Sequence, residues 1–349
     1  MMKLAGCLAV AAVLTGCGGA AATTPPSSSP PAATSAAAKP AASRPAASSA
    51  APSTAAKSSP APAAGTVIPF TAYSGAFAAI WVAADENIFP KYGIQPKVQY
   101  IDGNATANAL LAGEVPFSST PVIVNTILAG GDATLVAKLV SYPSFSLYGA
   151  KGIQRVEDLK GKVIADTQRG SAPDVALRDL LAKHGLKPAD VKFAYSPNPS
   201  TALATLAAGQ ASAAIISAPV TLQARSQGYK EIANTAKESV AGLAASISTK
   251  KERIQTDPGS VRNFLQALKD ATAFMIANPA QTKAIIGKYT KDTKAADLDE
   301  TYSVFKPTWI VGPLQPADVA ATLHYSSNPK AATANPATFY DNSIVESLK

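Results

Sequence analysis

A ten-residue segment, Ala165 to Asp174 (ADTQRGSAPD), carries residue types that could hold an anion. Its pattern is typical of a strand end, a tight turn and the first turn of a helix. Arg169, together with the amide groups that begin a helix, could bind a carboxylate, sulfonate or phosphate. Alternatively, Ser171 and Asp174 have the spacing of a capping box and Gly170 supplies a positive φ, so the segment could serve only to begin the helix. Both interpretations are open at this stage.

An anion site of this kind cannot supply a useful affinity alone. A helix N-terminus contributes up to about 2 kcal/mol and a charge-assisted hydrogen bond about 1.5 to 3 kcal/mol. Micromolar binding requires about 8 kcal/mol. Apolar contact must therefore supply the remainder, and the aromatic candidates for it are Tyr73, Phe77, Trp81, Tyr142, Phe145 and Tyr195. Trp81 falls on the apolar stripe of a predicted helix, and we expect it in the core.

The elements that would position these residues occur twice along the chain. Segments 66–94 and 161–186 each contain a β-rich run, a turn of small residues and a helical pattern that ends at glycine. Segments 106–122 and 201–220 each continue with an apolar helix, a glycine and a second β-rich run. Each copy therefore predicts a β-α-β-α-β lobe with a parallel sheet covered by helices.

Small and polar residues follow the strands in both copies, and open α/β sheets bind ligands at those strand ends. The predicted positions are Tyr73, Ser74, Gly75, Asn104, Ser119 and Thr120 in the first copy, and Arg169, Gly170, Ser171, Asn198, Ser200 and Ser217 in the second. Two Rossmann-like lobes that face each other across these loops would enclose a ligand cleft.

The chain must cross between the lobes and return. We place the first crossing within Ser141 to Gly152 and the return within Val240 to Ile254, a β-rich run that leads into helices. These crossings divide the folded part into lobe 1, at residues 66–145 and 245–349, and lobe 2, at residues 146–244. Two crossings between lobes would make a hinge.

The first 17 residues have the pattern of a bacterial lipoprotein signal peptide. A lysine precedes an apolar run that is too short to span a membrane, and the run ends in LTGC, which resembles a lipobox that leads to lipidation of Cys17. LAGC, which ends at Cys7, fits less well because no apolar segment precedes it. Residues 18–65 are rich in alanine, proline and serine, which predicts a disordered tether. We therefore expect a membrane-anchored protein outside the cytoplasm.

Several classes of function are disfavoured by composition. The formal net charge is +8, but no acidic residue precedes Asp85, so part of this positive excess belongs to the N-terminal segment and not to the folded part. No basic run with interleaved aromatics occurs either. We therefore expect no nucleic-acid partner. Cys7 and Cys17 are the only cysteines, which leaves the mature domain without a thiol nucleophile or a cysteine metal site. His184 precedes a glycine at a helix end and is expected to serve that end. We predict no catalytic residue, no metal and no cofactor.

Four motifs in order resemble a known family. They are SGAFAAIWVAADENIFPKYGI, DGNATANALLAGEVPFSSTPV, GIQRVEDLKGKVIADTQRGSAPD and LAAGQASAAIISAP. Together with the lipobox, they resemble the lipoprotein solute-binding proteins of bacterial ABC importers, in the group for sulfonate, nitrate, taurine and thiamine-pyrimidine precursors. The resemblance covers most of residues 66–300 and implies the α/β periplasmic binding protein type II-like fold.

This resemblance also implies a role and a site. Two lobes would close on a small anionic or heteroaromatic solute, such as a sulfonate, nitrate, carboxylate or a pyrimidine- or flavin-like compound, and deliver it to a membrane permease with its ATPase. The family's ligand-contacting loops correspond here to Ser74, Gly75, Phe77, Ser119, Thr120, Arg169, Gly170, Ser171, Ser217 and Pro219.

Two other roles remain possible on the same fold. The lobes could serve a sensory or docking receptor, and the sequence does not separate that role from import. Some relatives are enzymes that synthesise the thiamine pyrimidine with a cysteine-rich segment. No such segment is present here, and export would separate the protein from cytosolic metabolites, so the enzymatic role is disfavoured.

Overall fold

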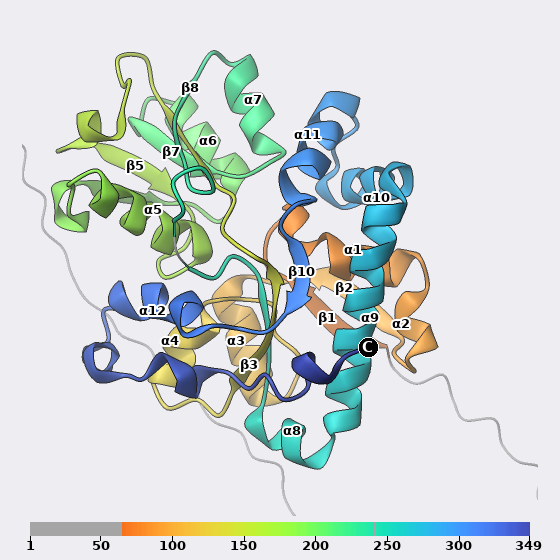
Figure 1. The fold of residues 1–349 in the computed structure, drawn as a ribbon. Helices are drawn as coiled ribbons and strands as arrows, with labels where there is room; N and C mark the ends of the chain where they lie inside the picture. The colour runs from red at the N-terminus through yellow and green to blue at the C-terminus, as the bar shows by residue number, and fades with distance from the viewer. Residues whose placement is uncertain (1–64, 241) are drawn as a thin grey trace, which may run out of the picture. The chain divides into compact units, whose positions relative to one another are not determined.

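A computed structural model describes residues 65–240 and 242–349 of the chain, all of which belong to one compact unit. The predicted signal peptide, Cys17 and all but the last residue of the predicted tether lie outside the described residues. Within them, the strands form three sheets (Figure 1). We use lobe 2 for the part built on the five-stranded sheet and lobe 1 for the part built on the other two.

Lobe 2 has a five-stranded sheet in the order β6-β5-β7-β4-β8. Its strands are β4 (Ser146–Gly149), β5 (Val163–Asp166), β6 (Lys192–Tyr195), β7 (Ala213–Ile216) and β8 (Lys230–Asn234). Strand β5 pairs in parallel with β6 and β7, as the repeat predicts, whereas β4 pairs antiparallel with β7 and β8. The additional strands arise because the chain enters and leaves this lobe through β4 and β8.

Helices cover both faces of this sheet. The helices are α5 (Ala172–Lys183), α6 (Pro199–Ala207) and α7 (Val220–Ser226). Leu177 and Leu181 of α5 belong to one buried cluster, and Leu203 of α6 belongs to another that includes Ala165 of β5. Helix α6 begins where it does because the Asn198 side chain accepts the backbone N–H of Thr201 at 2.9 Å.

Lobe 1 contains the parallel pair β1-β2 and the sheet β10-β3-β9. These strands are β1 (Thr66–Phe70), β2 (Pro96–Tyr100), β3 (Thr134–Val140), β9 (Ser246–Thr249) and β10 (Trp309–Gly312). The predicted third parallel strand of this lobe is not formed as such, because Ser118 makes only an isolated antiparallel bridge to Ser248. Pro116 and Pro121 flank this segment and supply no N–H for a ladder.

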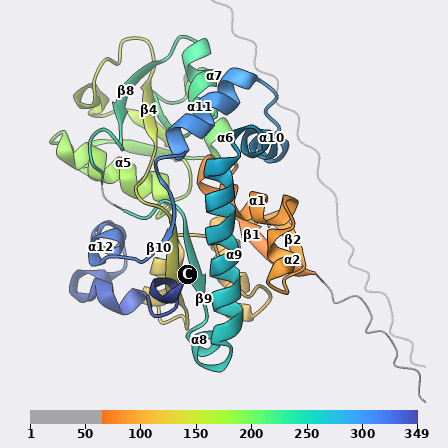
Figure 2. The same cartoon turned by 45° about the vertical axis from the view of Figure 1, so that its right-hand side comes forward.

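The lobe 1 helices surround these strands. They are α1 (Ala78–Asp85), α2 (Ile88–Lys91), α3 (Gly103–Ala112), α4 (Ile123–Leu128), α8 (Lys251–Thr256), α9 (Pro258–Ala277), α10 (Pro279–Thr290), α11 (Ala295–Phe305) and α12 (Pro316–His324). Helix α9 packs against α1 and β10 (Figure 2). Asp257 caps this helix by accepting the N–H of Ser260 at 3.1 Å. Trp81 is fully buried and stacks on Tyr289 at 5.0 Å, so its predicted place in the core is confirmed.

The predicted lobe limits fall between strands of different sheets. Strand β4 begins at Ser146, and β9 begins at Ser246 after a connection from β8 in the other lobe. We retain the limits at 145–146 and 244–245 as a working division.

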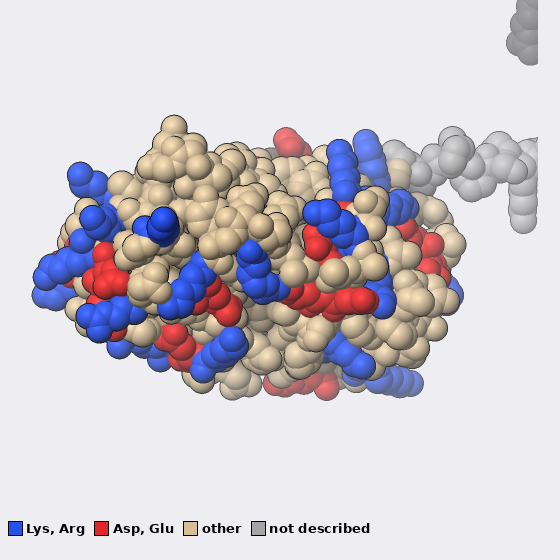
Figure 3. Space-filling view, turned by 90° about the horizontal axis from the view of Figure 1, so that it is seen from above, with Lys and Arg blue, Asp and Glu red and all other residues tan. Residues whose placement is uncertain are grey.

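None of the helices in the described part of the chain is long and apolar enough to cross a membrane. On the face seen in Figure 3, basic and acidic side chains are interspersed.

Candidate functional site

A cleft lies between the two lobes, at the ends of their strands. It encloses about 760 Å³, part of which is open to solvent. The lining residues are Thr71, Ala72, Ser74, Ala76, Phe77, Asp102, Gly103, Thr120, Pro121, Val122, Ser144, Phe145, Thr167, Gln168, Ser171, Ala172, Pro173, Pro197, Asn198, Pro199, Ser217, Ala244 and Phe305. Most of them follow β1, β2, β5, β6 or β7, or precede a helix, so the cleft occupies the place that the strand-end rule predicts.

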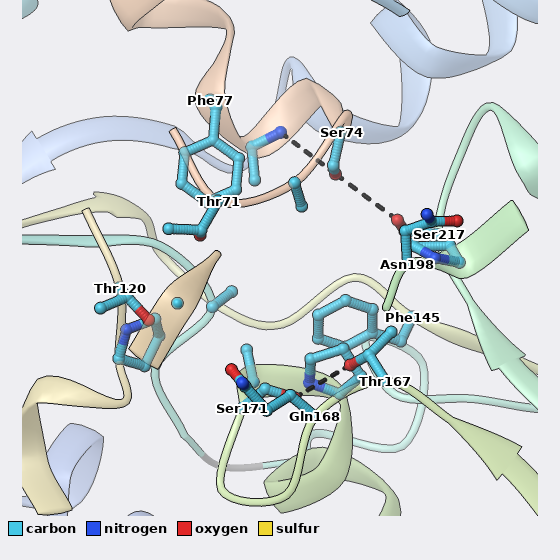
Figure 4. A pocket seen from close by; sticks show the side chains of 18 of the residues that line it. Thr71, Ser74, Phe77, Thr120, Phe145, Thr167, Gln168, Ser171, Asn198 and Ser217 are labelled. Atoms are coloured by element: carbon cyan, nitrogen blue, oxygen red, sulfur yellow. Dashed lines mark hydrogen bonds between the residues drawn. The ribbon is translucent and has the colours of Figure 1, made fainter. Parts of the chain in front are cut away.

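Aromatic rings supply much of the apolar lining. Phe77 projects from lobe 1 and Phe145 lies on the opposite side of the cleft (Figure 4). Phe305 reaches the cleft from the end of α11 and lies directly over Gly75, where a Cβ atom would stand 2.4 Å from its ring. Gly75 therefore admits Phe305 rather than facing a ligand, and Trp309 fixes its backbone by donating to the Gly75 carbonyl at 2.8 Å.

Direct hydrogen bonds join the lobes at the cleft. Ser217 Oγ of lobe 2 donates to Ser74 Oγ of lobe 1 at 3.5 Å (Figure 4). On another wall, Gln168 Nε2 donates to the two carboxylate oxygens of Asp102 at 3.2 and 3.4 Å. The two lobes thus contact each other through the same polar residues that line the cleft.

A further contact between the lobes lies outside the cleft. Glu300 of α11 accepts a hydrogen bond from Thr221 Oγ1 of α7 at 3.0 Å and forms an ion pair with Arg225. Arg225 also donates to Tyr148 Oη at 3.1 Å, which ties α7 to β4. Because α11 belongs to lobe 1 and α7 to lobe 2, the contacts of Glu300 with Thr221 and Arg225 exist only when the lobes are together.

The segment from Ala165 to Asp174 forms one wall of the cleft, but its hydrogen bonds differ from the prediction. Gly170 has φ +77°, as expected for its turn. The N-cap Ser171 makes no side-chain capping bond; its hydroxyl lies 2.9 Å from Thr167 Oγ1 instead. Asp174 Oδ2 accepts the N–H of Gly170 at 2.9 Å, one residue before the position that a capping box would use. The Gly170 N–H is therefore already hydrogen-bonded to Asp174 within the protein.

Behind this wall lies a buried network of charged groups. Asp174 accepts two hydrogen bonds of 2.9 Å from Arg178 and one of 3.1 Å from Tyr195 Oη. Asp166, at the end of β5, is fully buried and accepts the N–H of Thr167 at 2.6 Å. Burial, and next the negative charge of Asp174, raise the pKa of Asp166 well above its usual range. The raised pKa favours the protonated, neutral form of Asp166 over its carboxylate.

The cleft brings together only part of the predicted site. Ser74, Phe77, Thr120, Ser171, Asn198 and Ser217 are among its lining residues. Tyr73, Gly75, Asn104, Ser119, Arg169, Gly170 and Pro219 are not. Ser119 is buried, and its hydroxyl donates to the Pro69 carbonyl at 2.8 Å. Arg169 and Asn104 are exposed. The roles of the lining residues in ligand binding stay predictions.

Tyr73 lies outside the cleft because of contacts that its local sequence does not predict. Its ring is 40% exposed and stacks on Tyr100 of β2 at 5.1 Å. With Pro219 it lines a separate groove that also includes Lys291 and Asp292.

His184 is also outside the cleft. It ends α5, and its ring nitrogens lie 2.9 and 2.8 Å from the carboxylates of Glu157 and Glu238.

Sequence reasoning missed several lining residues. Asp102 lies shortly before Asn104, which we had predicted as a site residue. Its position between a strand and a helix could have indicated Asp102 as a lining residue as well. Gln168 was missed because its neighbour Arg169 is charged, and the prediction chose the charged residue as the one that binds the ligand. Phe305 left no sequence signal, because it comes from α11, which is far along the chain from the other lining residues.

Comparison with known proteins gives consistent relatives. Residues 74–282 match the family described as NMT1/THI5 like. A candidate binding protein of Brucella abortus (strain 2308) is 28% identical over 220 residues, which cover 61% of this chain and 68% of that protein. A candidate binding protein of Brucella melitensis matches with the same identity and the same shares.

Solved structures resemble the fold closely. The alkanesulfonate-binding protein SsuA of Xanthomonas axonopodis pv. citri, bound to MOPS, aligns with a TM-score of 0.67 at 21% identity, over 80% of this chain and 100% of that one. The periplasmic nitrate-binding protein NrtA of Synechocystis PCC 6803 aligns with a TM-score of 0.63 at 12% identity, over 81% of this chain and 88% of that one. The predicted fold class, two α/β lobes of a periplasmic binding protein, is thereby confirmed.

Proposed function

We propose that this chain, which belongs to the NMT1/THI5-like family, is the extracytoplasmic solute-binding component of an ABC importer. The observation that carries the proposal is the cleft: polar loops from both lobes line it together, and Ser74 and Ser217 meet across it. The two lobes would close on a small molecule and present it to a membrane permease with its ATPase.

Binding rather than catalysis is the role that the cleft supports. Its lining residues include no histidine, cysteine or lysine, side chains that commonly supply a nucleophile or a general base. Apolar rings, prolines, hydroxyl groups, two amides and one carboxylate line it, which is typical of sites that orient a small molecule. The similar solved structures reported above are named as binding proteins.

The N-terminal segment would attach this binding domain to a membrane. We propose that the segment is a signal peptide, that Cys17 becomes the lipidated first residue, and that residues 18–65 form the tether. Several acyl chains on one cysteine give a far firmer anchor than a single myristoyl chain. Mass spectrometry of the membrane fraction tests this: Cys17→Ser is expected to release the protein from membranes, and retained membrane association would contradict it.

The binding role is tested on freshly purified protein. A native mass spectrum is expected to show a retained small molecule that is lost after unfolding and refolding. Adding that molecule back at about 100 times its dissociation constant should stabilise the fold by about 2.7 kcal/mol, readable as a raised melting temperature. The loaded protein should also stimulate ATP hydrolysis by the permease complex with which it works. A loaded protein that leaves the ATPase unaffected would refute the import role.

A further inference from the structure

The cleft contains one charged side chain among its described lining residues, and that side chain is acidic. Asp102 lines the cleft, whereas no lysine, arginine or histidine is among the lining residues. In a site of this size, partly shielded from water, a carboxylate attracts a cation and opposes an anion far more strongly than it would in bulk solvent. The one charge among the described lining residues therefore has the opposite sign to the charge that would attract an anionic ligand.

The nearby positive groups are already engaged or point elsewhere. Arg169, the residue expected to hold an anion, is exposed and outside the lining. Arg178 is buried in its bidentate pair with Asp174. The same Asp174 takes the Gly170 N–H and lies in the first turn of α5, so it offsets the positive end of that helix. Helix α6 begins at the neutral Asn198.

Asp102 retains capacity to accept hydrogen bonds. Its Oδ1 caps α3 by accepting the N–H of Asn104 at 3.0 Å and of Ala105 at 3.5 Å, and it also accepts Gln168 Nε2 at 3.2 Å. Oδ2 has only the 3.4 Å contact with Gln168. A carboxylate offers about four lone-pair sites, so Oδ2 can take a further donor. At the α3 N-terminus a full negative charge outweighs the helix's half charge of about +0.5.

Gln168 makes this acceptor part of the closed cleft. It comes from lobe 2, and it can reach Asp102 because Gly103 has no side chain: a Cβ there would stand 3.0 Å from Gln168 Oε1 and 2.9 Å from Thr120 Oγ1. The Gln168 amide holds the carboxylate at the lobe boundary. A ligand bound to Asp102 therefore lies where both lobes meet.

We infer that the cleft selects an organic ligand with a cationic or N–H donor group, and that Asp102 is the residue that selects it. The donor group binds Asp102 Oδ2, while the rest of the ligand contacts Phe77 and Phe145 on opposite sides of the cleft. This inference rests on the proposed binding function. It departs from the sulfonate and nitrate named for two of the similar structures.

The test compares matched aromatic probes that differ in charge. Benzamidine carries a cationic donor, benzamide a neutral donor, and benzoate and benzenesulfonate are anions of similar size. Calorimetric titration of the full chain is expected to give benzamidine at least a tenfold lower dissociation constant than either anion. The Asp102→Asn variant should weaken benzamidine about 10- to 100-fold, because it loses a charge-assisted hydrogen bond, and should leave or improve the binding of benzoate.

A matched control separates charge selection from damage to a helix cap. Asparagine is as good an N-cap as aspartate, so Asp102→Asn should fold normally. Asp257→Asn makes the same change at the N-cap of α9, outside the cleft lining, and should leave all four probe affinities unchanged. Equal weakening by both variants would refute a specific role for Asp102.

The outcomes distinguish the inference from the proposed function. Anions that bind as tightly as benzamidine, or tighter, would overturn the inference while leaving a binding protein. If no probe binds at millimolar concentration and no small molecule is retained in the native mass spectrum, the inference and the binding function both fail.

Discussion

Replacing Asp166 with asparagine should change how the protein's stability depends on pH. Asp166 is fully buried at the end of β5, and burial together with the charge of Asp174 raises its pKa. Asparagine keeps the oxygen that accepts the Thr167 N–H and replaces the acid proton with an amide donor toward Asp174. Well below about pH 4, where the wild-type acid is neutral in both the folded and the unfolded state, the two proteins should differ by at most about 1 kcal/mol.

The sign follows from the direction of the pKa shift. The folded protein holds this proton more tightly than the unfolded chain, so its contribution to stability is complete below the unfolded pKa of about 4 and declines as pH rises toward the folded pKa. Within that window, wild type loses about 1.4 kcal/mol per pH unit relative to the asparagine variant, which does not titrate. Solvent screening does not reduce this effect, because the side chain is fully buried.

Urea denaturation followed by circular dichroism between pH 4.5 and 8 measures the difference. The variant's advantage in free energy of unfolding should grow with pH, with unchanged denaturant slopes. Asp132→Asn, which removes an exposed carboxylate, controls for the change in net charge and should show no such growth. Parallel pH profiles of wild type and Asp166→Asn would show that Asp166 is ionised in the folded protein and would refute the reasoning.

Three further substitutions test the contacts between and within the lobes. The double variant Ser74→Cys/Ser217→Cys should form a disulfide across the cleft, since the two Oγ atoms lie 3.5 Å apart; peptide mapping should find the linked pair and ligand release should slow, and a stable variant with two free thiols would contradict the contact. Glu300→Gln should weaken ligand binding by at most about fivefold through the lost ion pair between lobes, whereas tighter binding in titrations would contradict it. Burial lowers the pKa of His184, but hydrogen bonds to two glutamates outweigh this and raise it; its stabilisation is present below about pH 6.5 and is lost as pH rises through its folded pKa, so His184→Gln should cost about 0.2 to 1 kcal/mol at pH 5.5 and less at pH 8.5, and an equal cost at both would exclude the ion pairs.

Local sequence patterns were sufficient for the features that depend on neighbouring residues. The strand, turn and helix order around Ser74 and Gly170, the positive φ of Gly170 and the capping of α9 by Asp257 all follow from residues a few positions apart. The same patterns placed the polar loops at strand ends, which is why Ser217 and other predicted residues line the cleft.

Features that depend on distant segments were not predictable in this way. Phe305 enters the cleft from a helix more than 200 residues after Gly75, over which it lies. Gln168 meets Asp102 only because the two lobes come together. The charge of Arg169 indicated an anion site, but the direction of a side chain in a turn depends on packing that local sequence does not encode, and the residue is exposed.

The location of a bound ligand tests the account most directly. We propose a crystal structure of the protein prepared with the small molecule that its native mass spectrum identifies. The account predicts electron density between Phe77 and Phe145, with a donor atom within hydrogen-bond distance of Asp102 and with Ser74 and Ser217 in contact across the lobes. Density in the groove beside Tyr73 or on an outer face, with an unoccupied cleft between the lobes, would contradict it.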